Sequence, residues 1–406
     1  KKNSRIILSQ AFVTYLVRYF VILKKLFITC TSIIQMILVK ISYYICRIFN
    51  VKKKEGWVVV GVETASMLKN ISQALPGSVS VNFAPSHFYD FNYNYEVYSK
   101  KGILRVTKFL YSPLLLGYLL STYEKFIYLG ATGFISPHND GRMEEFKFIK
   151  SINKQLVCYF LGSEIRSFKL LNQFSQDRFL DVLTTYQAIS HKGSDSSENE
   201  DRRKLLGEVA NEYADVIFNP STDQMAYISQ ETFPCIYFLE GELFKHSLKK
   251  FDDLGEIIIL HGPSSPIIKG TPLVRAAVKK LKMEGYNFRY IELINVPHEQ
   301  MLKTLRSAHI VLNEFYAFVP GVFGLEAMAN HCALLTSADE NIETTLPCGA
   351  NKAWCVTPYW NIYDNLKNLL DNPEQLKSQA NAGFKWAKAN YQYDQAVNKL
   401  NEIVND

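Results

Sequence analysis

Short apolar runs alternate with amphipathic segments of helical length from Trp57 onward. Buried strands are expected at WVVVGV, KFIYLG and QLVCYFLG, and helices at ASMLKNISQAL and RMEEFKFIKSIN. The polar run HKGSDSSENEDRRK (191–204) is typical of an exposed loop, after which ADVIFNPS and CIYFLEG continue the strand pattern. Because strands that alternate with helices form parallel sheets with helical crossovers, the pattern predicts an α/β fold.

A second series of the same kind follows the polar connector SLKKFDDLG. Its expected strands and helices include EIIILHG, PLVRAAVKKLKMEG, NFRYIEL, PHEQMLKTLRSA, HIVLNEF, CALLTS and AWCV. We therefore expect two doubly wound domains, at 51–245 and 246–375, that face each other across a cleft. The remaining residues, 376–406, are expected to form helices that pack back across the domain junction.

Residues 1–50 are strongly apolar and carry no Asp or Glu. Five cations interrupt every candidate membrane span, so no clean 20-residue window is expected. These cations are Arg18, Lys24, Lys25, Lys40 and Arg47. On a continuous helix most of these cations fall on one stripe, which predicts an amphipathic segment at a membrane interface with its cations toward anionic lipid. A transmembrane hairpin and a protein–protein helix remain alternatives, whereas a cleaved signal peptide is disfavoured because no small-residue cleavage site follows.

Composition and charge narrow the function classes. With 48% hydrophobic and 21% charged residues the chain is globular, and its net charge of +6 arises largely before residue 55. A nucleic-acid surface is therefore not expected, since it would spread basic residues over a folded domain. The seven cysteines form no C-x-x-C pair and predict free thiols in a reducing compartment, and no cluster has the spacing of metal ligands.

The stretch LNEFYAFVPGVFGLEAMANHCALLTS (312–337) places Pro320 and Gly321 just before a helix. The first N–H groups of that helix, at Val322, Phe323 and Gly324, have no intrahelical partner and can cradle an anion. Glu326, one turn further on, is suited to hold the diol of a ribose. Together these features describe a nucleoside diphosphate site, although a helix start whose Glu merely complements the dipole remains an alternative.

A second candidate for anion binding is Lys269-Gly270 in LHGPSSPIIKGT (260–271), which follows the first strand of the second domain. Its ammonium could meet a diphosphate from the opposite side, although a solvated surface lysine is the alternative.

These two motifs resemble the donor-binding half of family 4 retaining glycosyltransferases with a GT-B fold, which consists of two Rossmann-like domains. Upstream segments such as WVVVGVETASML and ADVIFNPSTDQ are similar to the acceptor domain, so the resemblance covers about 56–395. It implies a UDP- or GDP-sugar donor and no other cofactor. It also implies donor-site roles for Lys269, Gly270, the Gly321–Gly324 backbone, Glu326, His261 as a cleft wall, and Ile294 and Val296 in the loop near the base.

The chain departs from the family pattern at three positions. Ser264 stands where a basic residue is common, with Arg275 as a candidate substitute. The first acid of the E-x7-E pair falls at Phe318, and the nearest acid is Glu314. Leu161 stands where relatives often have a histidine.

Candidate catalytic residues lie mainly in the first domain. Glu164 and Arg166 of GSEIRS are expected to begin a helix that faces the cleft and to orient sugar or acceptor, the alternative being a surface ion pair. His138 in SPHND could act as a base toward the acceptor or belong to a plain exposed loop, and Glu314 is the remaining acid. Retaining transfer needs no protein nucleophile, because the leaving diphosphate can accept the acceptor's proton.

The sequence thus predicts a glycosyltransferase at the cytoplasmic face of a membrane, acting on a lipid-linked or cell-surface glycan acceptor. A catalytically inactive scaffold of a polysaccharide-assembly complex is the main alternative, and a nucleotide-sugar epimerase is a third hypothesis. The oligomeric state remains open.

Overall fold

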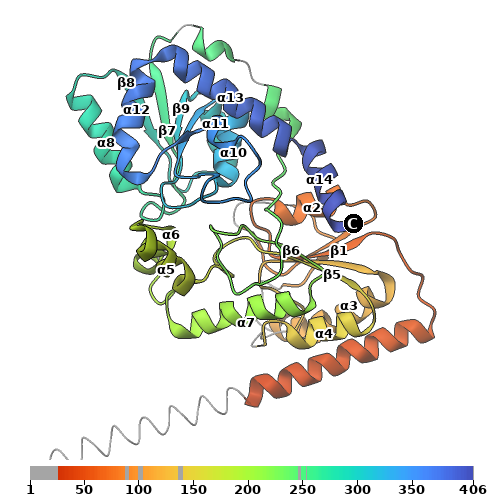
Figure 1. Cartoon of the computed structure of the whole chain (residues 1–406). Coiled ribbons are helices and arrows are strands. Elements are labelled where there is room, and N and C mark those ends of the chain that lie inside the picture. Colours follow the sequence, from red (N-terminus) through yellow and green to blue (C-terminus); the bar gives the residue numbers. More distant parts are fainter. Residues whose placement is uncertain are drawn as a thin grey trace, which may run out of the picture.

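The computed structural model describes residues 26–86, 91–98, 104–135, 140–245, 248–252 and 254–405, without the side chains of 104–107. Two parallel sheets, each flanked by helices, form two domains that lie one above the other in Figure 1. A long helix near the N-terminus runs along the lower edge of the first domain (Figure 1).

The first domain is built on a six-stranded parallel sheet in the order β3-β2-β1-β4-β5-β6. The order reverses between β1 and β4, which creates the switch point where ligands bind in such sheets. Its elements are β1 (Trp57–Gly61), α2 (Met67–Ala74), β2 (Val79–Asn82), β3 (Tyr95–Glu96), α3 (Leu104–Thr122), β4 (Lys125–Leu129), α4 (Met143–Ser151), β5 (Gln155–Tyr159), α5 (Phe168–Arg178), α6 (Leu183–Ser190), α7 (Ser197–Tyr213) and β6 (Val216–Phe218).

The second domain is built on a five-stranded parallel sheet in the order β11-β10-β9-β7-β8. It follows the short 3-10 turns η1 (Gly241–Lys245) and η2 (Leu248–Phe251). Its elements are β7 (Ile257–His261), α8 (Thr271–Met283), β8 (Phe288–Glu292), α9 (His298–Ser307), β9 (Ile310–Leu312), α10 (Gly321–Ala329), β10 (Ala333–Thr336), α11 (Ala350–Ala353), β11 (Cys355–Val356), η3 (Tyr359–Asn361) and α12 (Ile362–Asp371).

The last two helices connect the domains. Helix α13 (Pro373–Tyr391) buries Leu376 and Ala380 in the core of the second domain. Helix α14 (Tyr393–Asn405) instead buries Leu400 and Val404 against the first domain, in a cluster that includes Trp57. The chain therefore returns across the junction at its C-terminal end.

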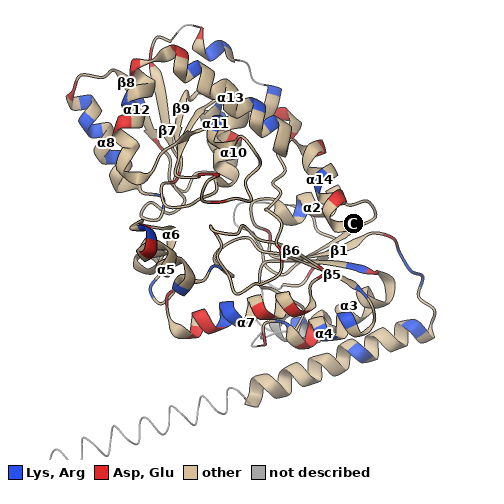
Figure 2. Cartoon of the chain, in the orientation of Figure 1, with Lys and Arg blue, Asp and Glu red and all other residues tan. Residues whose placement is uncertain are grey.

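The N-terminal helix Leu26–Ile48 packs one face on the first domain. Val39 and Tyr43 are buried, and the helix crosses α3 at Gly117, where an added Cβ would lie 2.4 Å from the carbonyl oxygen of Val39. The opposite face exposes apolar side chains: Ile33, Ile34, Ile37, Ile41, Tyr44, Ile45 and Ile48. Figure 2 shows cations and no acidic residue on this helix.

The 23 residues of this helix are long and apolar enough to cross a membrane by length and composition. Every 20-residue window within the helix contains Lys40, so the prediction that no such window is free of cations agrees with its bounds. Only Lys40 and Arg47 fall within its bounds, and both lie in its C-terminal half.

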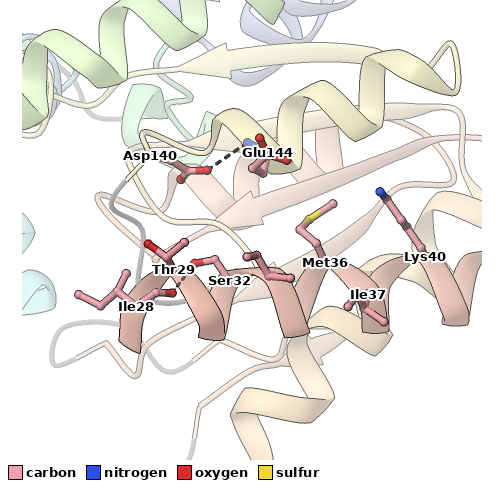
Figure 3. Close-up of a pocket in the computed structure, with 9 residues that line it drawn as sticks. Ile28, Thr29, Ser32, Met36, Ile37, Lys40, Asp140 and Glu144 are labelled. Atoms are coloured by element: carbon pink, nitrogen blue, oxygen red, sulfur yellow. Dashed lines mark hydrogen bonds between the residues drawn. The ribbon is translucent and has the colours of Figure 1, made fainter. Parts of the chain in front are cut away.

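A groove of about 550 Å³ separates the N-terminal half of this helix from the start of α4 (Figure 3). Thr29, Ser32 and Met36 line one side, and Asp140 and Glu144 line the other. The groove is thus acidic on the side of α4.

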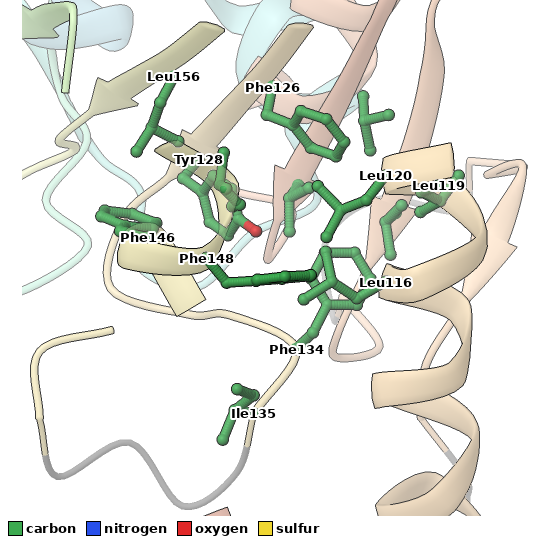
Figure 4. Close-up of a cluster of buried hydrophobic side chains, with 14 of the residues drawn as sticks. Leu116, Leu119, Leu120, Phe126, Tyr128, Phe134, Ile135, Phe146, Phe148 and Leu156 are labelled. Atoms are coloured by element: carbon green, nitrogen blue, oxygen red, sulfur yellow. The ribbon is translucent and has the colours of Figure 1, made fainter. Parts of the chain in front are cut away.

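The core beneath the sheet fixes the loop after β4 (Figure 4). Phe126, Phe134 and Phe146 are fully buried there, and burial of each phenylalanine side chain contributes about 1.5–3 kcal/mol. The buried carboxylate of Glu145 accepts hydrogen bonds from the Tyr128 hydroxyl at 2.5 Å and from the Phe134 amide at 3.1 Å. These contacts hold the loop at the carboxyl end of the sheet.

Two element predictions are wrong. The polar run 191–204 contains the start of α7, because Ser196 caps the helix by accepting from the Asn199 amide, and Glu198 and Glu200 suit its first turn. The run CIYFLEG forms no strand and contributes only an isolated bridge at Leu239. It is apolar because it passes through buried packing between the domains.

Candidate functional site

A cavity of about 320 Å³ lies at the junction of the two domains, and we call it the junction cavity. It forms where the loop after β7, the loop before α9 and the first turns of α10 meet the loop after β1. Ala65 comes from the first domain and the other lining residues from the second: Gly262, Ser264, Lys269, Val296, His298, Met301, Val322, Phe323 and Glu326. Five residues predicted from separate segments, Lys269, Val296, Val322, Phe323 and Glu326, are therefore brought together.

Glu326 is only 6% exposed and is held by a histidine. Nε2 of His298, the first residue of α9, lies 2.7 Å from Oε1 of Glu326. The hydrogen bond to Glu326 raises the pKa of His298, although burial opposes the shift. His298 is not among the residues predicted from the sequence, because its only local signal is its place beside the loop predicted to lie near the base.

The start of α10 is held in a fixed conformation beside the junction cavity. Gly321 adopts φ +60°, and Nδ2 of Asn313 donates to the Pro320 carbonyl at 2.8 Å, which fixes the chain where the helix begins. Gly324 has a packing role, since an added Cβ would lie 2.8 Å from Nδ2 of Asn313. Val322 and Phe323 thus form the part of this turn that lines the junction cavity.

Lys269 lies at the turn before α8, where Gly270 has φ +77°. Its ammonium forms an ion pair with Glu314, a carboxylate buried behind it. Burial raises the pKa of Glu314, and the charge of Lys269 opposes that shift. The sequence predicts different roles for Lys269 and Glu314, and the structure pairs the two side chains.

Three other predicted donor-site residues lie outside the lining of the junction cavity. His261 is fully buried, and its ring nitrogens contact the Leu312 carbonyl at 2.7 Å and the Thr271 hydroxyl at 2.8 Å. Burial lowers its pKa, so it holds the sheet to α8 as a neutral group. Ile294 is exposed on the nearby loop. Arg275 does not take the place of the missing cation at Ser264, because it pairs with Glu292.

Arg166 contributes to an interdomain contact. It lies in the turn before α5, which begins at Phe168, so the expectation that a helix begins at Glu164 and Arg166 is wrong. Nη2 of Arg166 is 2.7 Å from Oδ2 of Asp223, and Oδ1 of Asp223 accepts from the Phe318 amide at 2.8 Å. The Phe318 ring, at the position of the family's acid, packs between the domains against Leu171 and Val182.

Glu343 completes this contact from the second domain. Its fully buried carboxylate accepts from the backbone amides of Ser221 at 3.1 Å, Thr222 at 2.8 Å and Asp223 at 2.8 Å. We call Arg166, Asp223, Phe318 and Glu343 the interdomain clasp. Its bonded partners are between 57 and 122 residues apart in the chain, so no local sequence pattern indicates the clasp.

Glu164 lines a second cavity of about 630 Å³ in the first domain, the lateral cavity. Oε1 of Glu164 accepts from the Leu161 amide at 2.5 Å. The buried side chain of Gln187 also lines this cavity, and its Oε1 has no hydrogen-bond partner among the described residues. The lateral cavity adjoins the loops after β4 and β5, which neighbour the loop after β1 that supplies Ala65.

His138, the candidate base, lies outside the residues that the structure describes. Among the residues that the structure does describe, no group of three or more His, Cys, Asp or Glu is placed to hold a metal ion.

No protein-family model matches this chain, and no curated protein matches it by sequence. Among solved structures, sucrose-phosphate synthase from Thermosynechococcus elongatus is similar with a TM-score of 0.54 and 13% identity, covering 86% of this chain and 98% of the synthase. WaaG, a glycosyltransferase involved in lipopolysaccharide biosynthesis, has a TM-score of 0.49 and 10% identity, with 86% and 99% covered. The S. aureus MnaA–UDP co-structure has a TM-score of 0.43 and 13% identity, with 86% and 96% covered.

The last two structures are too distant to support a statement about this chain. The likeness to the synthase, together with the two parallel sheets, shows the fold. The chain has a GT-B fold, in which two Rossmann-like domains face each other across a cleft.

Proposed function

We propose that this protein is a glycosyltransferase that moves a sugar from a nucleoside-diphosphate donor to a lipid-linked or cell-surface glycan. The observation that carries the proposal is the junction cavity, a space of about 320 Å³ that is lined by Glu326, Lys269 and the start of α10. The solved structure that supports the fold is by its name a sucrose-phosphate synthase. The activity in that name fits the proposed chemistry, which is the transfer of a sugar.

Each side of the junction cavity suits one part of a UDP- or GDP-sugar. The carboxylate of Glu326 accepts hydrogen bonds from the ribose diol, and His298 holds that carboxylate in place. The diphosphate lies between the start of α10 and Lys269, which exchanges Glu314 for phosphate oxygens. Val296 borders the base.

The proposed chemistry retains the anomeric configuration, as in the family 4 enzymes that the sequence resembles. The bond between the sugar and the diphosphate breaks while the acceptor oxygen bonds to the same face of the sugar. The leaving diphosphate takes the acceptor's proton. Lys269 and the first amides of α10 act by stabilising the negative charge that develops on this leaving group. Glu164 orients the acceptor from the lateral cavity.

The proposed acceptor lies at a membrane, on its cytoplasmic side. The helix Leu26–Ile48 exposes an apolar face, which supports contact with a bilayer. An interfacial position is favoured over a span because Gln35 donates to the Phe109 carbonyl at 3.1 Å and Ser42 to the Leu114 carbonyl at 2.7 Å, which ties the helix to α3. The seven cysteines are free, which fits a reducing compartment.

A catalytically inactive scaffold is the second candidate. Two observations favour it: Phe318 fills the position of the family's acid with packing contacts, and Lys269 is already paired with Glu314. An epimerase on the same fold would differ from both by converting nucleotide-sugar in the absence of an acceptor.

A thermal-shift panel with UDP, GDP, ADP and TDP tests the site. One nucleotide is expected to raise the melting temperature of the wild type, since a ligand at 100 times its Kd stabilises by about 2.7 kcal/mol. Glu326→Ala should lose this shift, while Glu299→Ala, an exposed change on α9, should keep it. If no nucleotide stabilises the wild type, the junction cavity is not a donor site and the scaffold proposal replaces the enzyme.

A further inference from the structure

A cavity of about 450 Å³ lies where the helix Leu26–Ile48 ends against the first domain, and we call it the basic cavity. It shares no lining residue with the junction cavity or the lateral cavity. Its lining comes from the end of the helix, the connector to β1, the end of α3 and the turn after α4: Tyr43, Cys46, Arg47, Asn50, Val51, Lys52, Lys53, Leu120, Ser121, Glu124, Ile152 and Lys154.

Four cations and one carboxylate surround this cavity. Glu124 binds Lys53 at 2.9 Å and Lys154 at 2.7 Å. Burial acts to raise the pKa of Glu124, but the two lysines outweigh it and lower the pKa, so the carboxylate remains ionised. Arg47 and Lys52 form no ion pair within the described residues. The cavity therefore carries an excess of three positive charges and is suited to an anion.

Exposed apolar side chains stand beside these cations. Ile48 is 75% exposed and Phe49 is 77% exposed, at the end of the apolar face formed by Ile41 and Ile45. The exposed Arg47 is held beside this face, because its guanidinium packs over the buried Tyr43 ring and donates to the Tyr43 hydroxyl at 3.1 Å. A flat bilayer that receives the apolar face therefore brings its headgroups level with the basic cavity.

The opposite end of the helix does not suit an anionic lipid. The groove beside its N-terminal half is bordered by Asp140 and Glu144, with Lys40 at its far end (Figure 3). Figure 2 shows the same contrast, with cations on the helix near its junction with the connector. Charge complementarity thus selects the basic cavity as the contact for phosphate.

We propose that the basic cavity binds the phosphate of an anionic membrane lipid, and that this contact sets the orientation of the first domain on the bilayer. The proposal rests on the membrane association suggested above and is independent of nucleotide binding. Arg47 and Lys52 donate to the phosphate oxygens, while Ile48 and Phe49 enter the boundary between headgroups and acyl chains. Free phosphate has the same charge chemistry, but the adjacent apolar face favours the lipid.

The test is sedimentation of the full chain with vesicles of phosphatidylcholine alone or of an equimolar mixture with phosphatidylglycerol. The wild type is expected to bind the anionic vesicles more tightly. Arg47→Gln/Lys52→Gln should lose most of this preference, about fivefold in affinity for each cation near the surface. The control Lys279→Gln/Lys303→Gln removes the same charge from exposed positions on the second domain and should bind as the wild type does.

Equal binding by the wild type and the Arg47/Lys52 variant, or an equal loss in the control, would overturn the proposal. The variant Ile48→Ser/Phe49→Ser distinguishes a lipid phosphate from free phosphate, because it leaves the basic cavity intact. If the ligand is a lipid, this variant should bind vesicles more weakly than the wild type. Inorganic phosphate is expected to release no more protein than sodium chloride at the same ionic strength. Greater release would assign the basic cavity to free phosphate instead.

The nucleotide shift is measured on the same variants. A variant that loses vesicle binding but keeps its nucleotide shift is folded and isolates the lipid contact from the donor site. Vesicle binding by a wild type that shows no nucleotide shift would support the lipid site while removing the proposed enzyme function.

Discussion

Glu326 and His298 form a hydrogen-bonded pair in the lining of the junction cavity, the proposed donor site. The imidazole is partly exposed and the carboxylate is buried, and a hydrogen bond of 2.7 Å joins them. Because the pair raises the pKa of His298, the protonated histidine is favoured in the folded protein. The histidine thereby holds the carboxylate in place in the lining of the junction cavity.

His298→Gln should therefore reduce stability in a pH-dependent way. A raised folded pKa gives stability that is fully present below the ordinary value of 6.5 and is lost as the pH rises through the raised pKa. The melting temperatures of wild type and variant should differ most in acid and converge in base. His191→Gln, an exposed change, serves as the control. A difference that stays constant with pH would contradict the pairing.

Lys269 and Glu314 make opposite predictions for nucleotide affinity. Lys269→Met removes a charged donor to the diphosphate and should weaken binding about 10- to 100-fold, since such hydrogen bonds contribute about 1.5–3 kcal/mol. Glu314→Gln removes the competing carboxylate and should leave affinity equal or higher. Isothermal titration with the nucleotide found in the thermal-shift panel measures both. Equal losses in the two variants would show that the ion pair only supports the fold.

Much of the lining of the junction cavity could be predicted from the sequence because its residues stand in local motifs. Lys269, Val322, Phe323 and Glu326 follow strand ends in recognisable patterns, and parallel topology brings such loops to one edge. His298 could not be found in this way, because its role depends on a partner 28 residues away. His261 has a strand-end position too, but the sequence does not reveal that its ring is buried.

At the scale of elements, the close crossing of the N-terminal helix and α3 depends on one glycine. At Gly117 an added Cβ would lie 2.4 Å from the Val39 carbonyl oxygen and 2.8 Å from the Tyr43 amide nitrogen. Both contacts are with backbone atoms, so the helix itself would have to move.

Gly117→Ala is therefore expected to destabilise the protein by about 1–3 kcal/mol, the range for overpacking, and to loosen the helix Leu26–Ile48. Limited proteolysis should cleave this helix faster in the variant. Gly241→Ala, at a position with open space around it, is the matched control. Unchanged proteolysis in the Gly117 variant would show that the helix does not pack as closely as described.

Helices and strands could be predicted from the sequence where their hydrophobic pattern is typical of one type of element. Buried parallel strands such as β1 and β5 are continuous apolar runs and were identified directly. Helix α7 was missed at its start because its first turns are polar and its signal is a serine cap. The run 235–241 has the apolar pattern of a strand although it forms none, because burial between domains produces the same pattern.

At the scale of the whole molecule, the interdomain clasp couples the two domains at the edge of the cleft. Arg166 and Asp223 are both buried and paired, and Glu343 binds three consecutive amides across the junction. These contacts tie the loop after β6 in the first domain to the second domain.

Arg166→Met should destabilise the protein by about 3–5 kcal/mol, because it leaves the Asp223 carboxylate buried without its cation. Glu343→Gln should lose about 1.5–3 kcal/mol through weaker bonds to the amides of Ser221, Thr222 and Asp223. Small-angle scattering of Glu343→Gln should show a larger radius of gyration, whereas Glu374→Gln at an exposed position should match the wild type. An unchanged radius of gyration together with unchanged stability would show that the clasp does not hold the domains together.

Sugar transfer by this protein is measured directly as the movement of radiolabelled sugar from UDP- and GDP-sugars to the lipid-extractable fraction of membranes from the source cells. Wild type is expected to label this fraction with one donor, and Lys269→Met and Glu326→Ala should lose nearly all of that transfer while Glu299→Ala keeps it. If wild type binds a nucleotide yet transfers no sugar from any donor, the protein is a scaffold that has kept the donor cavity without the reaction.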